Sequence, residues 1–179
     1  MNKIDFVIAW VDGNDPEWLK QKNEYNPSKQ TDNSNIRYRD MDILKYWFRA
    51  VSEYAPWVNK VHFVTWGHLP EWLDTTCEKL HIVNHKDFIP ERFLPTFSSC
   101  PIELNLHRIP GLADKFVYFN DDMILNDKVT PEFFFRNGLP CDFAHINNVY
   151  NSEVADICSH ILINETWATS NHCSYMKVF

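Results

Sequence analysis

The sequence predicts an α/β protein, with a mainly parallel β-sheet and helices on both faces of that sheet. Short apolar runs rich in β-branched and aromatic residues predict buried strands at residues 4–11, 61–66 and 80–84, and a fourth strand that starts at Phe116. Segments with helical character separate these runs, and strands that alternate with helices are typical of a parallel sheet covered on both faces. Ligands of such sheets bind beyond the carboxyl ends of the strands, so a site is expected at that edge.

Three segments between the strands carry helical signals. Residues 16–25 start with a proline, which is favoured in the first turn of a helix. Residues 42–54 have apolar side chains at an amphipathic spacing, with Asp40 or Asp42 as the candidate N-cap. Residues 101–109 form the third segment and lead into the last predicted strand.

Length and composition fit one globular domain with a hydrophobic core. The chain has 179 residues, of which 45% are hydrophobic, and this excludes a disordered chain. Only four glycines occur, and neither a Walker-type nor a dinucleotide-binding glycine motif is present. A net charge of −7 argues against nucleic acid as a partner. The sequence changes character after Ile163, which predicts a domain over residues 1–163 and an irregular tail over residues 164–179.

The cysteines and the N-terminus favour a cytoplasmic protein. The cysteines are widely spaced, odd in number and without a Cys-x-x-Cys pair, which favours reduced thiols over a zinc site or a disulfide framework. The N-terminus leads straight into the first predicted strand, so no signal peptide is expected. No apolar run is long enough to span a bilayer, so no transmembrane segment is expected.

The most informative segment is the predicted strand that starts at Phe116 and ends in Asn120, Asp121 and Asp122. Polar and charged groups at the end of an apolar strand are costly to bury without a partner. A divalent cation, which prefers carboxylate oxygens, or a substrate hydroxyl that loses its proton would be such a partner. An ordinary turn is the alternative, because Asn and Asp favour turns. Other polar residues follow the other predicted strands: Asp12, Thr65 and Asn84.

Several motifs resemble the Stealth family of sugar-phosphate transferases, which includes bacterial capsular polysaccharide phosphotransferases and the catalytic part of animal N-acetylglucosamine-1-phosphotransferase. Residues 4–16, IDFVIAWVDGNDP, are similar to the first conserved region of the family. A longer second region is matched in order by RYRD at residues 37–40, LPTFSS at 94–99, IELNLHRIPGL at 102–112 and YFNDD at 118–122. The family normally continues into a third and a fourth conserved region, so the resemblance predicts a C-terminally truncated member.

The resemblance implies a Rossmann-like architecture that binds a nucleotide sugar, and an enzyme of capsule or exopolysaccharide synthesis. Members transfer a hexosamine 1-phosphate from a UDP-sugar, typically UDP-N-acetylglucosamine, to a hydroxyl of a saccharide acceptor, and the product is a phosphodiester. This chemistry needs positioning, neutralised phosphate charge and an acceptor for the hydroxyl proton. A cytoplasmic location is implied, with peripheral attachment to the inner face of the membrane left open. The oligomeric state is not predicted.

The resemblance also carries the candidate site residues. Asp121 and Asp122 are expected to bind Mg²⁺ or Mn²⁺, or one of them acts as a base. Arginines offer forked donors that suit phosphate oxygens. The catalytic candidates are Asp12, Asp121, Asp122, His107 and Arg108. The substrate-binding candidates are Arg37, Arg39, Asp40, Thr65, Asn105 and Asn120.

Each assignment has a structural alternative, and so does the function. An arginine of an acidic protein often pairs with a surface carboxylate, Arg39 and Asp40 could brace the helix that follows them, and His107 could be a packing residue. An ordinary metal-dependent nucleotide-sugar glycosyltransferase also ends a strand with paired carboxylates. It would release UDP, whereas transfer of a sugar phosphate releases UMP. An inactive truncated remnant is the third reading.

Overall fold

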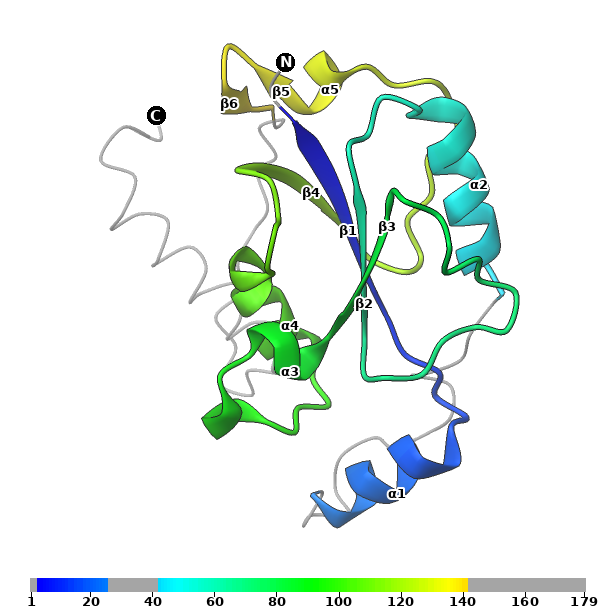
Figure 1. Ribbon diagram of the computed structural model, residues 1–179, viewed down its shortest axis with the longest axis vertical. Coiled ribbons are helices and arrows are strands. Elements are labelled where there is room, and N and C mark those ends of the chain that lie inside the picture. The colour runs from blue at the N-terminus through cyan, green and yellow to red at the C-terminus, as the bar shows by residue number, and fades with distance from the viewer. Residues whose placement is uncertain (1–2, 26–41, 142–179) are drawn as a thin grey trace, which may run out of the picture. The chain divides into compact units, whose positions relative to one another are not determined.

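The central sheet is parallel throughout. The structure is a computed structural model that describes residues 3–25 and 42–141. Within these ranges, four strands form the main sheet in the order β3-β2-β1-β4. β1 (Ile4–Trp10) pairs in parallel with β2 (Val61–Thr65) and with β4 (Lys115–Phe119), and β3 (Leu80–Asn84) pairs in parallel with β2. The predicted mainly parallel α/β fold is confirmed (Figure 1).

Helices cover both faces of this sheet. α2 (Leu44–Tyr54) lies on one face, and α3 (His85–Phe88) and α4 (Ser99–Asn105) lie on the other (Figure 1). α1 (Pro16–Glu24) follows β1. The remaining described elements are the 3₁₀ helices η2 (Glu91–Phe93) and η3 (Leu106–Arg108), α5 (Pro131–Phe134), and an antiparallel pair of short strands, β5 (Phe135–Arg136) and β6 (Leu139–Pro140).

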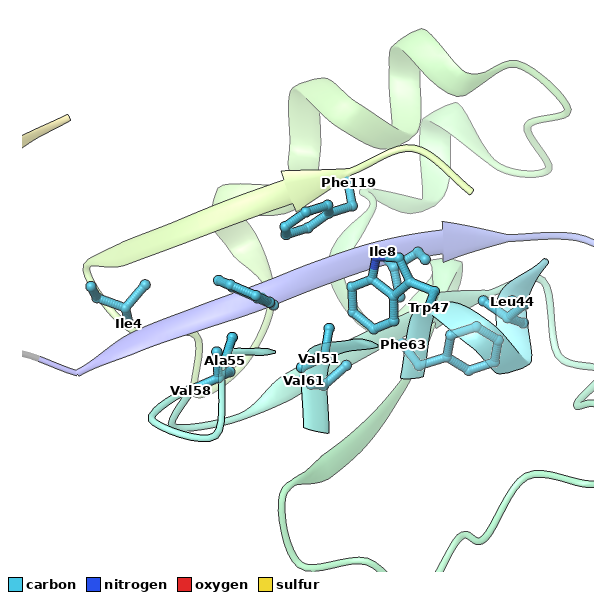
Figure 2. Close-up of a cluster of buried hydrophobic side chains, with 11 residues drawn as sticks. Ile4, Ile8, Leu44, Trp47, Val51, Ala55, Val58, Val61, Phe63 and Phe119 are labelled. Carbon is cyan, nitrogen blue, oxygen red and sulfur yellow. The ribbon is translucent and has the colours of Figure 1, made fainter. Parts of the chain in front are cut away.

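Alternation along β1 divides the core into two layers. Phe6 and Ile8 belong to the cluster on the α2 face, whereas Val7 belongs to the cluster formed with α3 and η3. All three side chains are fully buried, as expected for a strand with helices on both sides. Figure 2 shows the α2 cluster, in which the buried Trp47 lies against Phe119 of β4 with ring centroids 5.5 Å apart. The packing of α2 therefore fixes the last residue of β4.

A hydrogen-bonded cluster of ionisable groups lies at the amino edge of the sheet. The Asp5 carboxylate is fully buried and accepts hydrogen bonds from the Asn59 amide (2.7 Å), the Lys60 backbone N–H (3.1 Å) and the Ala113 backbone N–H (2.8 Å). Its second oxygen lies 2.9 Å from Nε2 of the buried His62. Burial acts to raise the pKa of Asp5, but these hydrogen bonds and the nearby His62 outweigh it and hold the pKa below its usual range.

The observed helices test the sequence predictions directly. Predicted helix 16–25 matches α1, predicted helix 42–54 matches α2, and residues 101–109 form the end of α4 and then η3. The capping role predicted for Asp42 is wrong. The α2 N-cap is Ile43, without a side-chain cap, and Asp42 pairs instead with Lys45 from a backbone conformation with a φ of 58°. Asp40, the other candidate cap, lies outside the described residues.

The chain divides into two units after Cys141, and all described elements lie in the first unit, residues 1–141. The predicted boundary between residues 163 and 164 lies outside the described residues. In the described part of the chain, no helix combines the length and the apolar character needed to cross a membrane.

Candidate active site

A cavity of about 330 Å³ opens at the carboxyl edge of the sheet, between the ends of β1 and β4. Trp10 and Val11 line it from the β1 side, and Tyr118, Asp121 and Asp122 line it from the β4 side. The chain runs from β1 to β2 on one side, while β4 pairs with the other side of β1. This is the topological switch point of the sheet, where open parallel sheets bind their ligands.

A turn after β4 holds the paired carboxylates at this cavity. Phe119 is buried against Trp47, and the Met123 backbone N–H then donates to the Asn120 carbonyl oxygen at 3.1 Å. Asp121 and Asp122 lie between these two turn residues and are exposed. The turn that the sequence offered as an alternative is therefore present, and Asn120, Asp121 and Asp122 all line the cavity that it borders.

A third carboxylate reaches the cavity from α4. Glu103 lines the cavity, and the Tyr118 hydroxyl donates a long hydrogen bond to it at 3.5 Å. Burial, followed by the charges of Glu103, Asp121 and Asp122, raises the pKa of Tyr118 well above its usual range. Tyr118 therefore stays a neutral hydrogen-bond donor next to three carboxylates.

Two buried polar residues form another part of the wall. His85 and Thr96 are each 9% exposed and both line the cavity. Burial, with a smaller contribution from His68, lowers the pKa of His85 to about 4. The imidazole is therefore neutral at physiological pH, with one nitrogen that donates and one that accepts.

The charge of the cavity is negative. Its described lining contains the carboxylates of Glu103, Asp121 and Asp122 and no lysine or arginine. Such a concave acidic surface attracts cations. Among the described residues, no group of three or more His, Cys, Asp or Glu side chains is arranged to hold a metal ion. Mg²⁺ is commonly bound by only one or two carboxylates together with substrate phosphates, and the Asp121–Asp122 pair fits that mode.

Asp12 and Thr65 lie at the carboxyl edge but do not line the cavity. The Asp12 backbone N–H donates to Nε2 of His68 at 2.7 Å, and its carboxylate accepts from the Asn14 backbone N–H at 2.9 Å. Thr65 is fully buried, and its hydroxyl donates to the His68 carbonyl oxygen at 2.7 Å. Both residues are therefore bonded into the loops that follow β1 and β2.

The candidates from the end of α4 also lie away from the cavity lining. The Asn105 amide donates to the Pro101 carbonyl oxygen at 2.8 Å, within its own helix. His107 and Arg108 belong to η3 and are exposed. Arg37, Arg39 and Asp40 lie outside the described residues. Of the predicted site residues, the described structure brings Asn120, Asp121 and Asp122 together at the cavity.

Sequence reasoning did not select Glu103, Tyr118, His85 or Thr96 as site residues. A signal existed for His85, which directly follows the predicted strand over residues 80–84 at the edge where ligands bind. A weaker signal existed for Glu103, an acidic residue within the motif at residues 102–112.

A cavity at the switch point of a Rossmann-like parallel sheet is typical of α/β domains that bind their ligands at the strand ends. Residues 2–30 match the Stealth protein CR1, conserved region 1, and residues 37–142 match the Stealth protein CR2, conserved region 2. The chain belongs to the Stealth family.

Curated relatives share about half of their aligned residues with this chain. A capsular polysaccharide phosphotransferase WcwK of Streptococcus pneumoniae is 54% identical over 142 residues, which are 78% of this chain and 43% of the relative. The exopolysaccharide phosphotransferase cps2G of Lactiplantibacillus plantarum is 51% identical over 154 residues, covering 86% of this chain and 45% of the relative. The receptor polysaccharide phosphotransferase WefC of Streptococcus oralis is 53% identical over 145 residues, covering 78% and 44%. The aligned part of the chain thus covers less than half the length of each of these relatives.

Proposed function

We propose that this chain carries the nucleotide-sugar site of a polysaccharide phosphotransferase. The observation that carries the proposal is the acidic cavity at the β1–β4 switch point, in a chain whose relatives are named as capsular, exopolysaccharide and receptor polysaccharide phosphotransferases. The proposed donor is a UDP-N-acetylhexosamine, and the proposed acceptor is a saccharide hydroxyl. The transferred group is the hexosamine 1-phosphate.

In the proposed reaction, the acceptor oxygen forms a bond to the sugar-linked phosphorus. The phosphoanhydride bond to the nucleotide breaks, and UMP leaves with the bonding electron pair. The Asp121–Asp122 pair supplies the oxygens for a divalent cation and the acceptor for the hydroxyl proton. When bound, Mg²⁺ or Mn²⁺ would neutralise the diphosphate charge that the carboxylate-lined cavity would otherwise repel.

The other cavity residues are proposed to bind or position ligands, without holding the cation or accepting a proton. Tyr118 stays protonated, so its hydroxyl donates its one proton to Glu103 and its oxygen can accept a hydrogen bond from a ligand. Trp10 lines the cavity at the end of β1, and its ring packs against Phe63 and His68. Asp12 and Thr65 act in this proposal through the loops that they hold, and the exposed His107 and Arg108 are candidates for contacts with the acceptor or with further parts of the protein.

The test is to identify the nucleotide that the purified full chain releases. The chain is incubated with UDP-N-acetylglucosamine, Mg²⁺ or Mn²⁺, and short saccharide acceptors. Release of UMP is expected, and it should fall at least about 100-fold in the Asp121→Asn/Asp122→Asn variant. Asp114→Asn is the matched control, because Asp114 is an exposed aspartate at the opposite end of β4.

Two results would overturn the proposal. Release of UDP with transfer of the sugar alone would identify an ordinary glycosyltransferase. The second result is a chain that is folded by circular dichroism but neither releases a nucleotide nor binds UDP-N-acetylglucosamine. It would show that the chain has no nucleotide-sugar site.

A further inference from the structure

A second cavity adjoins the acidic cavity. Its volume is about 450 Å³, and Trp66, Lys86 and Glu91 are among the residues that line it. His85 and Thr96 line both cavities. The two spaces therefore meet at these two buried side chains, and a group bound in one lies next to a group bound in the other.

His85 is held at this junction by the start of α3. The Asn84 backbone N–H donates to the Asp87 carboxylate at 2.8 Å in a capping box, which fixes the first turn of the helix. The His85 side chain is 9% exposed, and the described part of the chain gives its ring no hydrogen-bond partner. Its ring nitrogens are not among the fully buried unpaired atoms of the described residues, so solvent in the cavities reaches them. A ligand hydroxyl at the junction would replace that water as the hydrogen-bond partner.

The remaining wall of the second cavity differs in charge from the acidic cavity. It contains one lysine, Lys86, and one glutamate, Glu91, so these two charges cancel. Trp66 is partly exposed, and its indole N–H donates to the Gln21 amide oxygen at 3.0 Å, which fixes the ring. A fixed aromatic ring beside a few polar groups suits the apolar face and hydroxyls of a sugar ring. The balanced charge favours a neutral ligand over a phosphate.

We propose that this second cavity binds the acceptor saccharide as a neutral pyranose, with Trp66 under the sugar ring and His85 positioning one of its hydroxyls toward the acidic cavity. The inference rests on the proposed function, because it assigns the acceptor of the same reaction. His85 is a positioning residue here, and it binds the hydroxyl without taking its proton.

The test uses fluorine NMR of the full chain labelled with 5-fluorotryptophan. Trp66 reports on the second cavity and Trp10 on the acidic cavity, and Trp→Phe variants assign their signals. The probes are methyl glycosides of glucose, galactose and N-acetylglucosamine, and UDP-N-acetylglucosamine with Mg²⁺. We expect at least one glycoside to shift the Trp66 signal at millimolar concentration. The shift should persist when UDP-N-acetylglucosamine is saturating and has shifted the Trp10 signal.

Variants separate the positioning role from a structural one. Lys86→Ala should weaken glycoside binding at least about fivefold, whereas Lys60→Ala at the amino edge should leave it unchanged. His85→Leu should abolish the Trp66 shift, and His85→Gln, which keeps a hydrogen-bonding side chain, should restore it. Both His85 variants should keep the far-UV circular dichroism spectrum of the unchanged chain, which shows that a lost Trp66 shift is not a loss of the fold.

The possible failures are distinguishable. If UDP-N-acetylglucosamine shifts Trp10 and no glycoside shifts Trp66, the second cavity is not an acceptor site, while the nucleotide-sugar site stands. If glycosides shift Trp10 and UDP-N-acetylglucosamine displaces them, the acceptor shares the acidic cavity and the inference is overturned. If UDP-N-acetylglucosamine shifts no tryptophan signal, the proposed function itself fails.

Discussion

The two edges of the sheet place ionisable side chains in opposite environments. At the amino edge, Asp5 and His62 are fully buried and bonded to each other, and backbone N–H groups complete the coordination of the Asp5 carboxylate. At the carboxyl edge, Asp121 and Asp122 are exposed in a turn beside a cavity. Both edges carry aspartate and histidine, so residue type alone does not separate them.

The difference lies in what completes the hydrogen bonding of each group. Asp5 is surrounded by protein donors, which stabilise its charged form and leave no room for a ligand. His85, at the carboxyl edge, is 9% exposed and lines two cavities. A buried polar group that is satisfied contributes to stability, whereas one that faces a cavity is available for binding. Variants at the two edges should therefore affect different measurements.

The largest effect is expected at the amino edge. Asp5→Asn should lower the free energy of unfolding by about 3–5 kcal/mol, because the new NH₂ group faces N–H donors at a fully buried position. Urea unfolding followed by circular dichroism measures this change. Asp114→Asn, an exposed change next to the start of β4, should stay within about 0.5 kcal/mol. A loss below about 1 kcal/mol for Asp5→Asn would mean that the buried cluster does not stabilise the sheet.

Acidification should destabilise the protein through His85. Its pKa is about 4 in the folded protein and 6.5 as the ordinary value, so the unfolded chain binds the proton first as pH falls. The stability associated with neutral His85 is complete above pH 6.5 and is lost as pH falls toward 4, by about 3 kcal/mol. His85→Gln should show a smaller difference between pH 7 and pH 4 in urea unfolding. If the free energy of unfolding falls equally with pH in both proteins, His85 is not the source of the acid destabilisation.

Local sequence signals predicted the strands of the sheet, because each strand is an apolar run that can be recognised without knowledge of its contacts. α3 was not predicted, since a helix of four residues leaves almost no periodic signal. The Asp42 cap was wrong because the chain turns at Asp42 with positive φ and the side chain pairs with Lys45. Capping depends on the backbone angle at which the chain enters the helix, and the sequence does not specify it.

The candidate site was only partly accessible to sequence reasoning for a different reason. The position of Asp121 and Asp122 directly after an apolar strand predicts a site there. Glu103 instead reaches the cavity from α4, and His85 and Thr96 reach it from other connections. The buried Asp5–His62 pair likewise requires the pairing of β1 with β2. These contacts join residues distant in sequence, and only the strand order and register bring them together.

At the carboxyl edge, Glu103→Gln should weaken metal binding more than it weakens the fold. Removal of one of three carboxylates lowers the attraction of the cavity for a cation. We expect the affinity for Mn²⁺ in the presence of UDP to fall about tenfold, measured by electron paramagnetic resonance of free Mn²⁺. The free energy of unfolding should change by less than about 0.5 kcal/mol, because Glu103 is exposed. A large loss of stability with unchanged Mn²⁺ affinity would show that Glu103, like Asp5, stabilises the fold and does not contribute to metal binding.

The smallest effect is expected at the start of α1, which contributes to both cavities of the carboxyl edge. The Asp15 carboxylate caps α1 by accepting the Trp18 backbone N–H at 2.7 Å, and it also lies 3.6 Å from Nδ1 of His68. Asp15→Ala should lower the free energy of unfolding by about 1 kcal/mol through the lost cap. α1 carries Trp18 in the acidic cavity and Gln21 in the second cavity. Fraying of the first turn of α1 should therefore weaken UDP-N-acetylglucosamine binding more than glycoside binding. The fluorotryptophan signals measure both affinities. Equal weakening of both ligands would show that α1 supports the two cavities as one rigid element.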